Sequence, residues 1–290
     1  MDGASLLFSQ HGWADTNRRM LAFGLAVAPP GTEVVATDLG FLRTWQRLEP
    51  LIDHVEAEAA AFLEQFPASP ACIVGHSMGG LIWLTLLDRH PEWRRRVTSL
   101  ALIGCPVRGA ELAAALDRQG WTIARDLAVD RGELAARVAA TVPTISVAGN
   151  LLLASDGTVT LRSARVDGAR FVCLPRESHA GLVKSDRVIR LVRAFIHDPH
   201  PPPTDTPSLI ARLQAIAGAV PSIDRLPPGG KVSLLFPDGA NVRVRFPPLG
   251  MLQVSLYDPE GGCLWAGSVP RRNAGDLRQA LQDLEAHALR

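Results

Sequence analysis

Six short apolar runs lie in the first two thirds of the chain, and longer segments with helical spacing of apolar residues separate them. The runs show no regular polar alternation, which is typical of strands buried on both faces. Alternation of such strands with helices predicts a parallel sheet with crossover helices. The predicted strands are 4–10, 32–38, 70–76, 97–104, 141–149 and 169–175, and the predicted helices are 16–27, 48–65, 78–89, a pair within 109–139, and 184–196.

The pattern changes after residue 197. The stretch HDPHPPPTDTPS is rich in proline and favours an extended linker at 199–208. A helix is predicted near 209–217, and short alternating strands with turn signals between them follow, closed by an amphipathic helix at 274–289. We therefore predict an α/β domain at 1–198, with a lid-like insertion at about 107–140, and a small antiparallel α+β domain of unknown role at 209–290.

Residues 75–79 read Gly-His-Ser-Met-Gly, between a buried strand run and a helical pattern. This strand–turn–helix setting is the one in which a G-x-S-x-G sequence presents a serine nucleophile. We therefore predict that Ser77 is the nucleophile. Gly75 and Gly79 lack the Cβ atoms that would collide where strand and helix pass closely. The alternative is an ordinary glycine-rich turn with an incidental serine.

A serine hydroxyl needs a base, and the base needs a carboxylate that orients it. After the serine, these residues are expected in the order acid, then histidine, beyond the ends of later strands. Asp156 follows the fifth predicted strand and His179 follows the sixth. Asp130 and Asp167 are rival acids, but the first precedes the fifth strand and the second adjoins the sixth.

The first predicted strand ends in His11-Gly12-Trp13. A loop here can bring the Trp13 backbone N–H over the nucleophile, where it would form an oxyanion hole with the N–H of Met78. Leu151, Leu152 and Leu153 precede the candidate acid. They either line a groove for an apolar acyl chain or extend the fifth strand into the core.

The sequences HGW, VGHSMGG, SDGTV and SHAGL together resemble the α/β-hydrolase superfamily, in particular its serine lipase and esterase branch. The resemblance covers about residues 4–196 and implies a Ser77/Asp156/His179 triad with an oxyanion hole from Trp13 and Met78. Superfamily members usually carry two more strands before the one that ends in HG. The resemblance therefore implies a minimal core of six strands, and the short insertion implies a small lid at most.

Composition narrows the class further. Thirty basic and twenty-nine acidic residues give a net charge of +1, which provides no electrostatic argument for nucleic acid or an anionic membrane. The four cysteines are far apart, without metal-ligand or disulfide spacing, which favours a reducing compartment. We predict no metal and no cofactor. With no signal-peptide pattern and no apolar stretch of membrane-spanning length, we expect a cytoplasmic protein without stable membrane insertion.

We therefore predict an esterase or lipase that acts on a small-molecule ester with an apolar acyl group. A thioesterase, an acyltransferase or an amidase would use the same three residues, and the sequence leaves these alternatives open. A hydrolase fold that only binds a partner is a further alternative, although the candidate residues are all present. The sequence does not determine the oligomeric state.

Overall fold

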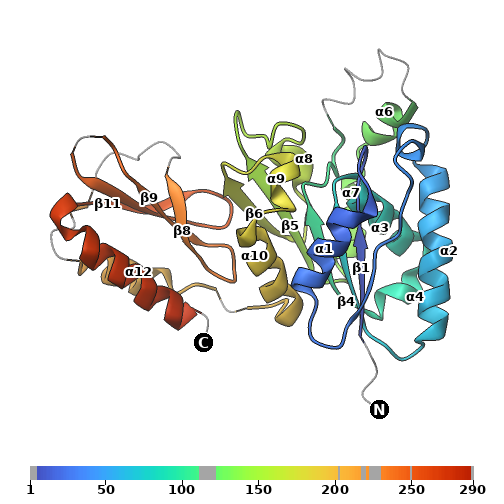
Figure 1. The fold of residues 1–290 in the computed structure, drawn as a ribbon, viewed down its shortest axis with the longest axis horizontal. Coiled ribbons are helices and arrows are strands. Elements are labelled where there is room, and N and C mark those ends of the chain that lie inside the picture. The colour runs from blue at the N-terminus through green and yellow to red at the C-terminus, as the bar shows by residue number, and fades with distance from the viewer. Residues whose placement is uncertain are drawn as a thin grey trace. The chain divides into compact units, whose positions relative to one another are not determined.

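A computed structural model of the chain describes residues 5–110, 122–201, 203–216, 220–221, 230–248 and 250–288. It divides into two compact units, Met1–His200 and Pro201–Arg290. Each unit has its own sheet (Figure 1).

The first unit contains a six-stranded sheet in which every neighbouring pair is parallel. The strand order is β2-β1-β3-β4-β5-β6, and each strand coincides with one of the six predicted runs, although β5 extends one residue beyond its run, to Asn150. The predicted six-stranded parallel sheet is therefore confirmed. The strands are β1 (Leu6–Gln10), β2 (Glu33–Val35), β3 (Ala71–His76), β4 (Val97–Ile103), β5 (Thr144–Asn150) and β6 (Arg170–Pro175).

Helices cover both faces of this sheet. The chain runs from β1 outward to β2 and then returns past β1 to β3, so right-handed crossovers place the connecting helices on opposite faces. One face carries α1 (Asn17–Val27) and α10 (Asp186–His197), while α2 (Glu49–Gln65), α3 (Met78–Arg89) and α7 (Gly132–Ala139) lie on the other (Figure 1). Shorter elements are η1 (Arg43–Trp45), α4 (Pro91–Arg94), α6 (Thr122–Leu127), α8 (Leu161–Ala164) and α9 (His179–Leu182).

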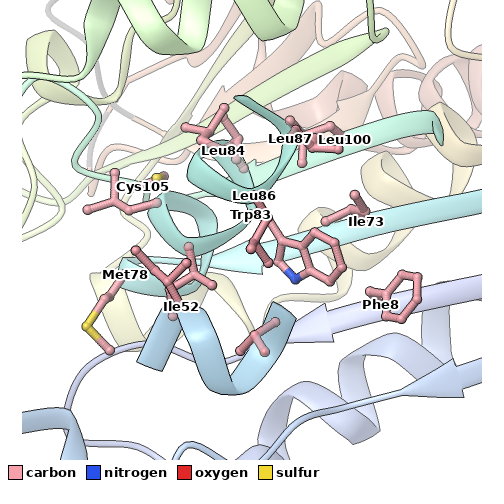
Figure 2. Packing of buried hydrophobic residues seen from close by; sticks show 14 of the residues in the cluster. Phe8, Ile52, Ile73, Met78, Trp83, Leu84, Leu86, Leu87, Leu100 and Cys105 are labelled. Carbon is pink, nitrogen blue, oxygen red and sulfur yellow. The ribbon is translucent and has the colours of Figure 1, made fainter. Parts of the chain in front are cut away.

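Helix α3 lies in the centre of the main hydrophobic cluster. Most of its residues are buried, because the helix is apolar on nearly all sides. Trp83 packs against Phe8 of β1, with ring centroids 4.8 Å apart, and Ile52 of α2 lies in the same cluster (Figure 2). This packing fixes the start of α3, and therefore residue 77, against the sheet.

The predicted insertion at 107–140 contributes to the hydrophobic core. Its residues 111–121 lie outside the described residues. Helix α7, however, is a crossover helix, and its Ala135 and Val138 are buried in the same cluster as α3. Val107, Ile123 and Leu127, which precede α7, are buried in this cluster as well, so the described part of the predicted insertion belongs largely to the core.

The second unit contains a five-stranded antiparallel sheet of order β7-β11-β10-β9-β8. One hydrophobic cluster joins this sheet to two helices through residues such as Leu213, Leu256 and Leu277. The predicted antiparallel sheet and terminal helix are confirmed. The elements are α11 (Thr206–Gln214), β7 (Val220–Pro221), β8 (Lys231–Leu235), β9 (Asn241–Arg245), β10 (Leu252–Tyr257), β11 (Cys263–Val269), η2 (Arg271–Asn273) and α12 (Ala274–Ala288).

Helix α11 begins earlier than the sequence pattern predicts. The side chain of Asp205 accepts a hydrogen bond from the Ser208 N–H and caps the helix, and Pro207 occupies its first turn. Proline is favoured there because the first N–H groups of a helix have no intrahelical acceptor. The predicted linker at 199–208 therefore extends into the helix. No helix in the described part of the chain is long and apolar enough to cross a membrane.

Candidate active site

The candidate residues lie at one edge of the six-stranded sheet. Parallel strands all end at the same edge, and loops beyond this edge form the usual site of α/β proteins. Trp13 follows β1, Ser77 follows β3, Asp156 follows β5 and His179 follows β6. Residues that are distant in the sequence are thereby brought to one place.

Ser77 forms a sharp turn between β3 and α3. Its φ of 54° and ψ of −125° are unusual for a residue with a side chain. The Ser77 N–H donates to Ile103 O of β4 at 2.8 Å, which anchors the turn to the sheet. A serine held in this way projects its hydroxyl above the strand ends.

Two glycines allow this turn to pack closely. A Cβ atom on Gly75 would lie 2.5 Å from the Gly80 Cα, and one on Gly79 would lie 2.4 Å from the Gln10 carbonyl oxygen. Both distances are far below ordinary contact, and the neighbours are backbone atoms. The close backbone contacts therefore require glycine at positions 75 and 79, for the reason that the sequence motif indicates.

The segment after β1 runs directly over the turn. A Cβ on Gly12 would lie 2.9 Å from Ser77 Cβ and 3.2 Å from the Met78 nitrogen. Met78 is the first residue of α3, so its N–H has no intrahelical acceptor and lies at the positive end of the helix dipole. The Gly12–Trp13 peptide and the Met78 N–H are therefore neighbours of the Ser77 side chain.

His11 fixes the orientation of that peptide. Its Nε2 accepts a hydrogen bond from the Leu39 N–H at 3.0 Å, so the proton resides on Nδ1, which donates to the Gly12 carbonyl at 3.0 Å. Burial lowers the pKa of His11 and favours this neutral form. In a trans peptide the N–H points opposite to the C=O. The bond from His11 to the Gly12 oxygen therefore turns the Trp13 N–H away from His11.

Asp156 and His179 form a close pair. Asp156 is 2% exposed, and its Oδ1 accepts hydrogen bonds from the Thr158 N–H at 2.9 Å and the Val159 N–H at 2.7 Å. Its Oδ2 accepts a third from His179 Nδ1 at 2.7 Å. Because a carboxylate only accepts, Nδ1 carries the proton and Nε2 of His179 is left as an acceptor. The imidazole is therefore oriented and has a defined tautomer.

The backbone and β4 support the same histidine. The His179 N–H donates to the Asp156 carbonyl at 2.9 Å. Gly104, at the end of β4, has φ of 55°, and a Cβ there would lie 3.1 Å from His179 Nδ1. A larger residue in place of Gly104 would displace the imidazole.

His76 contacts His179 from the strand side. Its Nε2–H donates to the His179 carbonyl at 3.2 Å, and the two ring centroids are 4.8 Å apart. Burial, together with the nearby charges of His179 and Arg19, lowers the pKa of His76 to about 3. His76 is therefore a neutral hydrogen-bond donor that holds the His179 backbone. The role of His76 was not predicted, because it occupies a variable position of the G-x-S-x-G pattern, and the pattern does not indicate a function for the residue there.

The rival acids have other partners. Asp130 Oδ1 accepts a hydrogen bond from the N–H of Gly132, the first residue of α7, at 2.7 Å. Asp167 has a side chain that is 76% exposed and pairs with Arg108 at 2.9 Å. Of the three candidate acids, Asp156 is the one with a hydrogen bond to His179.

Ser77 and His179 line a cavity of about 240 Å³. Segments of several loops contribute to it. Its lining residues are Trp13, Ala14, Asp15, Arg19, His76, Ser77, Pro106, Ala110, Leu127, Thr158, Val159, His179 and Ala180.

Leu151, Leu152 and Leu153 are not part of this lining. They are 50%, 68% and 89% exposed, and β5 ends at Asn150. The extension of the fifth strand into the core is therefore wrong, and the groove predicted for these leucines is not the cavity beside Ser77. Leu153 and Ala154 have positive φ, and a tight loop closed by hydrogen bonds between residues 152 and 155 turns the three leucines outward.

A larger cavity of about 670 Å³ lies elsewhere in the first unit and contains none of the three candidate residues. Its lining mixes arginines with carboxylates that pair with one another, such as Arg47 with Asp126 at 2.9 Å. The described residues that line it include no serine, cysteine or histidine. Among the described residues, no group of three or more His, Cys, Asp or Glu side chains could hold a metal ion.

Residues 4–155 match the model of a hydrolase family described as serine aminopeptidase, S33. The match spans more than half of the chain and includes the Ser77 turn. The chain belongs to this α/β-hydrolase family. No curated protein matches it in sequence.

Solved structures agree with this fold. The mature form of the Bacillus licheniformis lipase BlEst2 is 16% identical, with a TM-score of 0.52, covering 67% of this chain and 92% of the lipase. Est1E from Butyrivibrio proteoclasticus is 14% identical, with a TM-score of 0.51, covering 69% of this chain and 89% of Est1E. At these identities the similarity concerns the fold alone.

Proposed function

We propose that this hydrolase cleaves carboxylic esters with an apolar acyl group, with Ser77 as nucleophile, His179 as base and Asp156 as the orienting acid. The observation that carries the proposal is the 2.7 Å hydrogen bond from His179 Nδ1 to the buried Asp156, in a cavity that His179 shares with Ser77. An imidazole with its Nδ1 proton held in this way has Nε2 available for a serine proton.

The mechanism follows from these positions. His179 Nε2 takes the Ser77 hydroxyl proton as the oxygen attacks the substrate carbonyl, and the backbone N–H groups of Trp13 and Met78 stabilise the oxyanion. The tetrahedral intermediate collapses to an acyl-enzyme when His179 gives its proton to the leaving alcohol. Water then attacks the acyl carbonyl with His179 again as base, the bond between the acyl carbon and Ser77 Oγ breaks, and His179 returns the proton to Oγ as the carboxylic acid leaves. Each oxyanion donor contributes about 3 kcal/mol in comparable enzymes.

The apolar part of the cavity supports the acyl preference. Pro106, Ala110, Leu127 and Val159 come from the exit of β4, from α6 and from the Asp156 loop. Apolar side chains around a few polar groups are typical of a small-molecule site. We therefore place the acyl group against these residues.

An amidase is the second candidate, because the matched family is described as a serine aminopeptidase. The same acyl-enzyme would form from an amide, with an amine as the leaving group. The two candidates differ only in the substrate.

The first experiment is labelling of the purified protein with a fluorophosphonate probe, followed by mapping of the labelled peptide by mass spectrometry. We expect a label on Ser77 in the folded protein, none in Ser77→Ala and none after heat denaturation. Absence of a label in folded protein would contradict an activated Ser77. Rates on 4-nitrophenyl esters of graded chain length and on matched 4-nitroanilides then separate an esterase from an amidase.

A further inference from the structure

The cavity beside Ser77 also contains an ion pair. Asp15 precedes α1 and Arg19 lies in its first turn, and Arg19 Nη1 donates to Asp15 Oδ2 at 3.0 Å. Among the residues described as lining this cavity, no other is a lysine, arginine, aspartate or glutamate. The pair is therefore the charged feature that a substrate at Ser77 would meet.

In this ion pair, the Asp15 oxygens already accept hydrogen bonds, whereas Arg19 has N–H donors that remain available. Asp15 Oδ1 accepts from the Thr16 N–H at 2.9 Å and Oδ2 accepts from Arg19, so both carboxylate oxygens are engaged. A guanidinium has five N–H donors. In the described part of the chain, Asp15 is the one acceptor that Arg19 contacts, so Nε and Nη2 still have donors to offer.

The exposure of the Arg19 side chain and the charges around it also indicate an accessible cation. The Arg19 side chain is 38% exposed, whereas that of Asp15 is 16% exposed, so the cation is the more accessible partner. The Arg19 charge also helps to lower the pKa of His76, directly before Ser77. In addition, the first turn of α1 has no acidic residue and its N-cap, Thr16, makes no side-chain hydrogen bond. The positive end of the helix dipole therefore adds to the Arg19 charge.

We propose that Arg19 forms an anion subsite of the Ser77 cavity, and that the preferred substrates carry a carboxylate near the scissile ester as well as an apolar acyl group. A carboxylate fits the planar guanidinium through two parallel hydrogen bonds. A single negative charge suits the site better than a phosphate dianion, because Asp15 offsets part of the Arg19 charge. This inference rests on the proposed hydrolase function and names its substrate class.

The test compares matched neutral and anionic esters on the full chain. One pair places the charge on the acyl side, with 4-nitrophenyl hexanoate against mono-4-nitrophenyl adipate. The other places it on the alcohol side, with phenyl butyrate against the butyrate ester of 3-hydroxybenzoate. In at least one pair we expect kcat/KM of the anionic ester to exceed that of its neutral partner about tenfold, as charge-assisted hydrogen bonds give in other sites.

Three variants locate the preference. Arg19→Gln should bring the ratio of anionic to neutral kcat/KM close to one. Asp15→Asn should raise this ratio, because it removes a negative charge and keeps an oxygen for the Thr16 N–H. Arg18→Gln is the matched control, since Arg18 is an exposed neighbour that does not line the cavity, and it should retain the wild-type ratio. Added salt should lower the wild-type ratio, because salt screens the accessible charge.

Binding provides a readout that does not depend on turnover. In the Ser77→Ala background, calorimetry with monomethyl adipate should give a dissociation constant that rises about tenfold when Arg19→Gln is added. Equal ratios in wild type and Arg19→Gln, or equal binding in the two Ser77→Ala proteins, would overturn the anion subsite. Failure of Ser77 labelling would instead overturn the proposed hydrolase, and the binding comparison would still decide the subsite.

Discussion

Ser77 has a strained backbone conformation, with φ of 54°. A residue with a side chain in such a conformation costs about 1–3 kcal/mol, and it persists only where neighbours determine it. The Ser77 N–H is bound to Ile103 O, and the Ser77 carbonyl accepts the Gly80 N–H at 3.0 Å. The strain is therefore held by β4 on one side and by the first turn of α3 on the other.

The role of Asp156 can be separated from its structural contacts. In Asp156→Asn, the amide oxygen can still accept from the Thr158 and Val159 N–H groups, while the amide nitrogen replaces Oδ2 and cannot accept from His179 Nδ1. The imidazole then loses the tautomer that a base requires. We expect kcat to fall by about 10⁴, as for the equivalent change in a well-studied triad. Steady-state rates on a neutral ester, with circular dichroism to verify folding, provide the measurement.

Asp167→Asn is the control for this change. Asp167 is exposed and bound to Arg108, so its substitution should leave kcat within about twofold, as for surface changes outside a site. A loss of activity in Asp167→Asn that matches the loss in Asp156→Asn would contradict the assignment of the acid.

His76 should make stability depend on pH. Burial, together with the charges of His179 and Arg19, lowers its pKa in the folded chain from 6.5 to about 3. Between these two pH values, His76 is protonated in the unfolded chain but not in the folded chain. Stability therefore falls as the pH falls below about 6.5, with a limiting slope of about 1.4 kcal/mol per pH unit for one proton.

The measurement is urea unfolding of wild type and His76→Gln at pH 7, 6 and 5. Glutamine keeps a donor for the His179 carbonyl but does not titrate, and the second unit is common to both proteins. The free energy of unfolding should fall more steeply towards acid in the wild type. Parallel pH dependence of the two proteins would show that His76 titrates alike in the folded and unfolded chains.

At the scale of elements, the contact between α3 and the end of β1 is the most restrictive. In Gly79→Ala the new methyl group would lie 2.4 Å from the Gln10 carbonyl oxygen, and rotation of a side chain cannot relieve this collision. Overpacking of this kind costs about 1–3 kcal/mol or more. The end of β1 should shift, and with it the Gly12–Trp13 peptide beside Ser77. We therefore expect a lower melting temperature and slower fluorophosphonate labelling of the protein that remains folded.

Gly275→Ala is the control for Gly79→Ala, because it replaces a glycine that makes no close contact. Nothing lies within 4 Å of a Cβ at this position in α12, so the change should be neutral or stabilise the chain by up to about 1 kcal/mol. Unchanged labelling in Gly79→Ala would contradict the close approach of α3 and β1.

The sequence predicted the elements whose signal is local. The strands were recognisable because parallel strands buried on both faces are continuously apolar, and the turn at Ser77 because a short motif lies between a strand and a helix. The outward direction of Leu151–Leu153 was not predictable from the sequence. An apolar run does not reveal that positive φ at Leu153 and Ala154 turns the three leucines outward. Arg19 was missed for a related reason. Its place in the cavity depends on how α1 docks on the sheet, which no local pattern contains.

At the scale of the whole molecule, the chain consists of two compact units. Each sheet is formed entirely by strands of its own unit, and each unit has at least one hydrophobic cluster of its own among the described residues. Every element that carries a candidate site residue belongs to the first unit. A domain with its own core can in principle fold alone.

A fragment of residues 1–200 should therefore fold and remain reactive. Its six-stranded sheet, the clusters around α3 and the His179–Asp156 pair are all internal to it. We expect a cooperative melting transition and Ser77 labelling at a rate within about threefold of the full chain, because no site residue is removed. The same fragment with Ser77→Ala provides the background. A folded fragment that is not labelled would show that the second unit is needed for a reactive Ser77, since the loss could then not be attributed to unfolding. An unfolded fragment would show that the second unit stabilises the first, and that the self-contained core of residues 1–200 is not sufficient by itself.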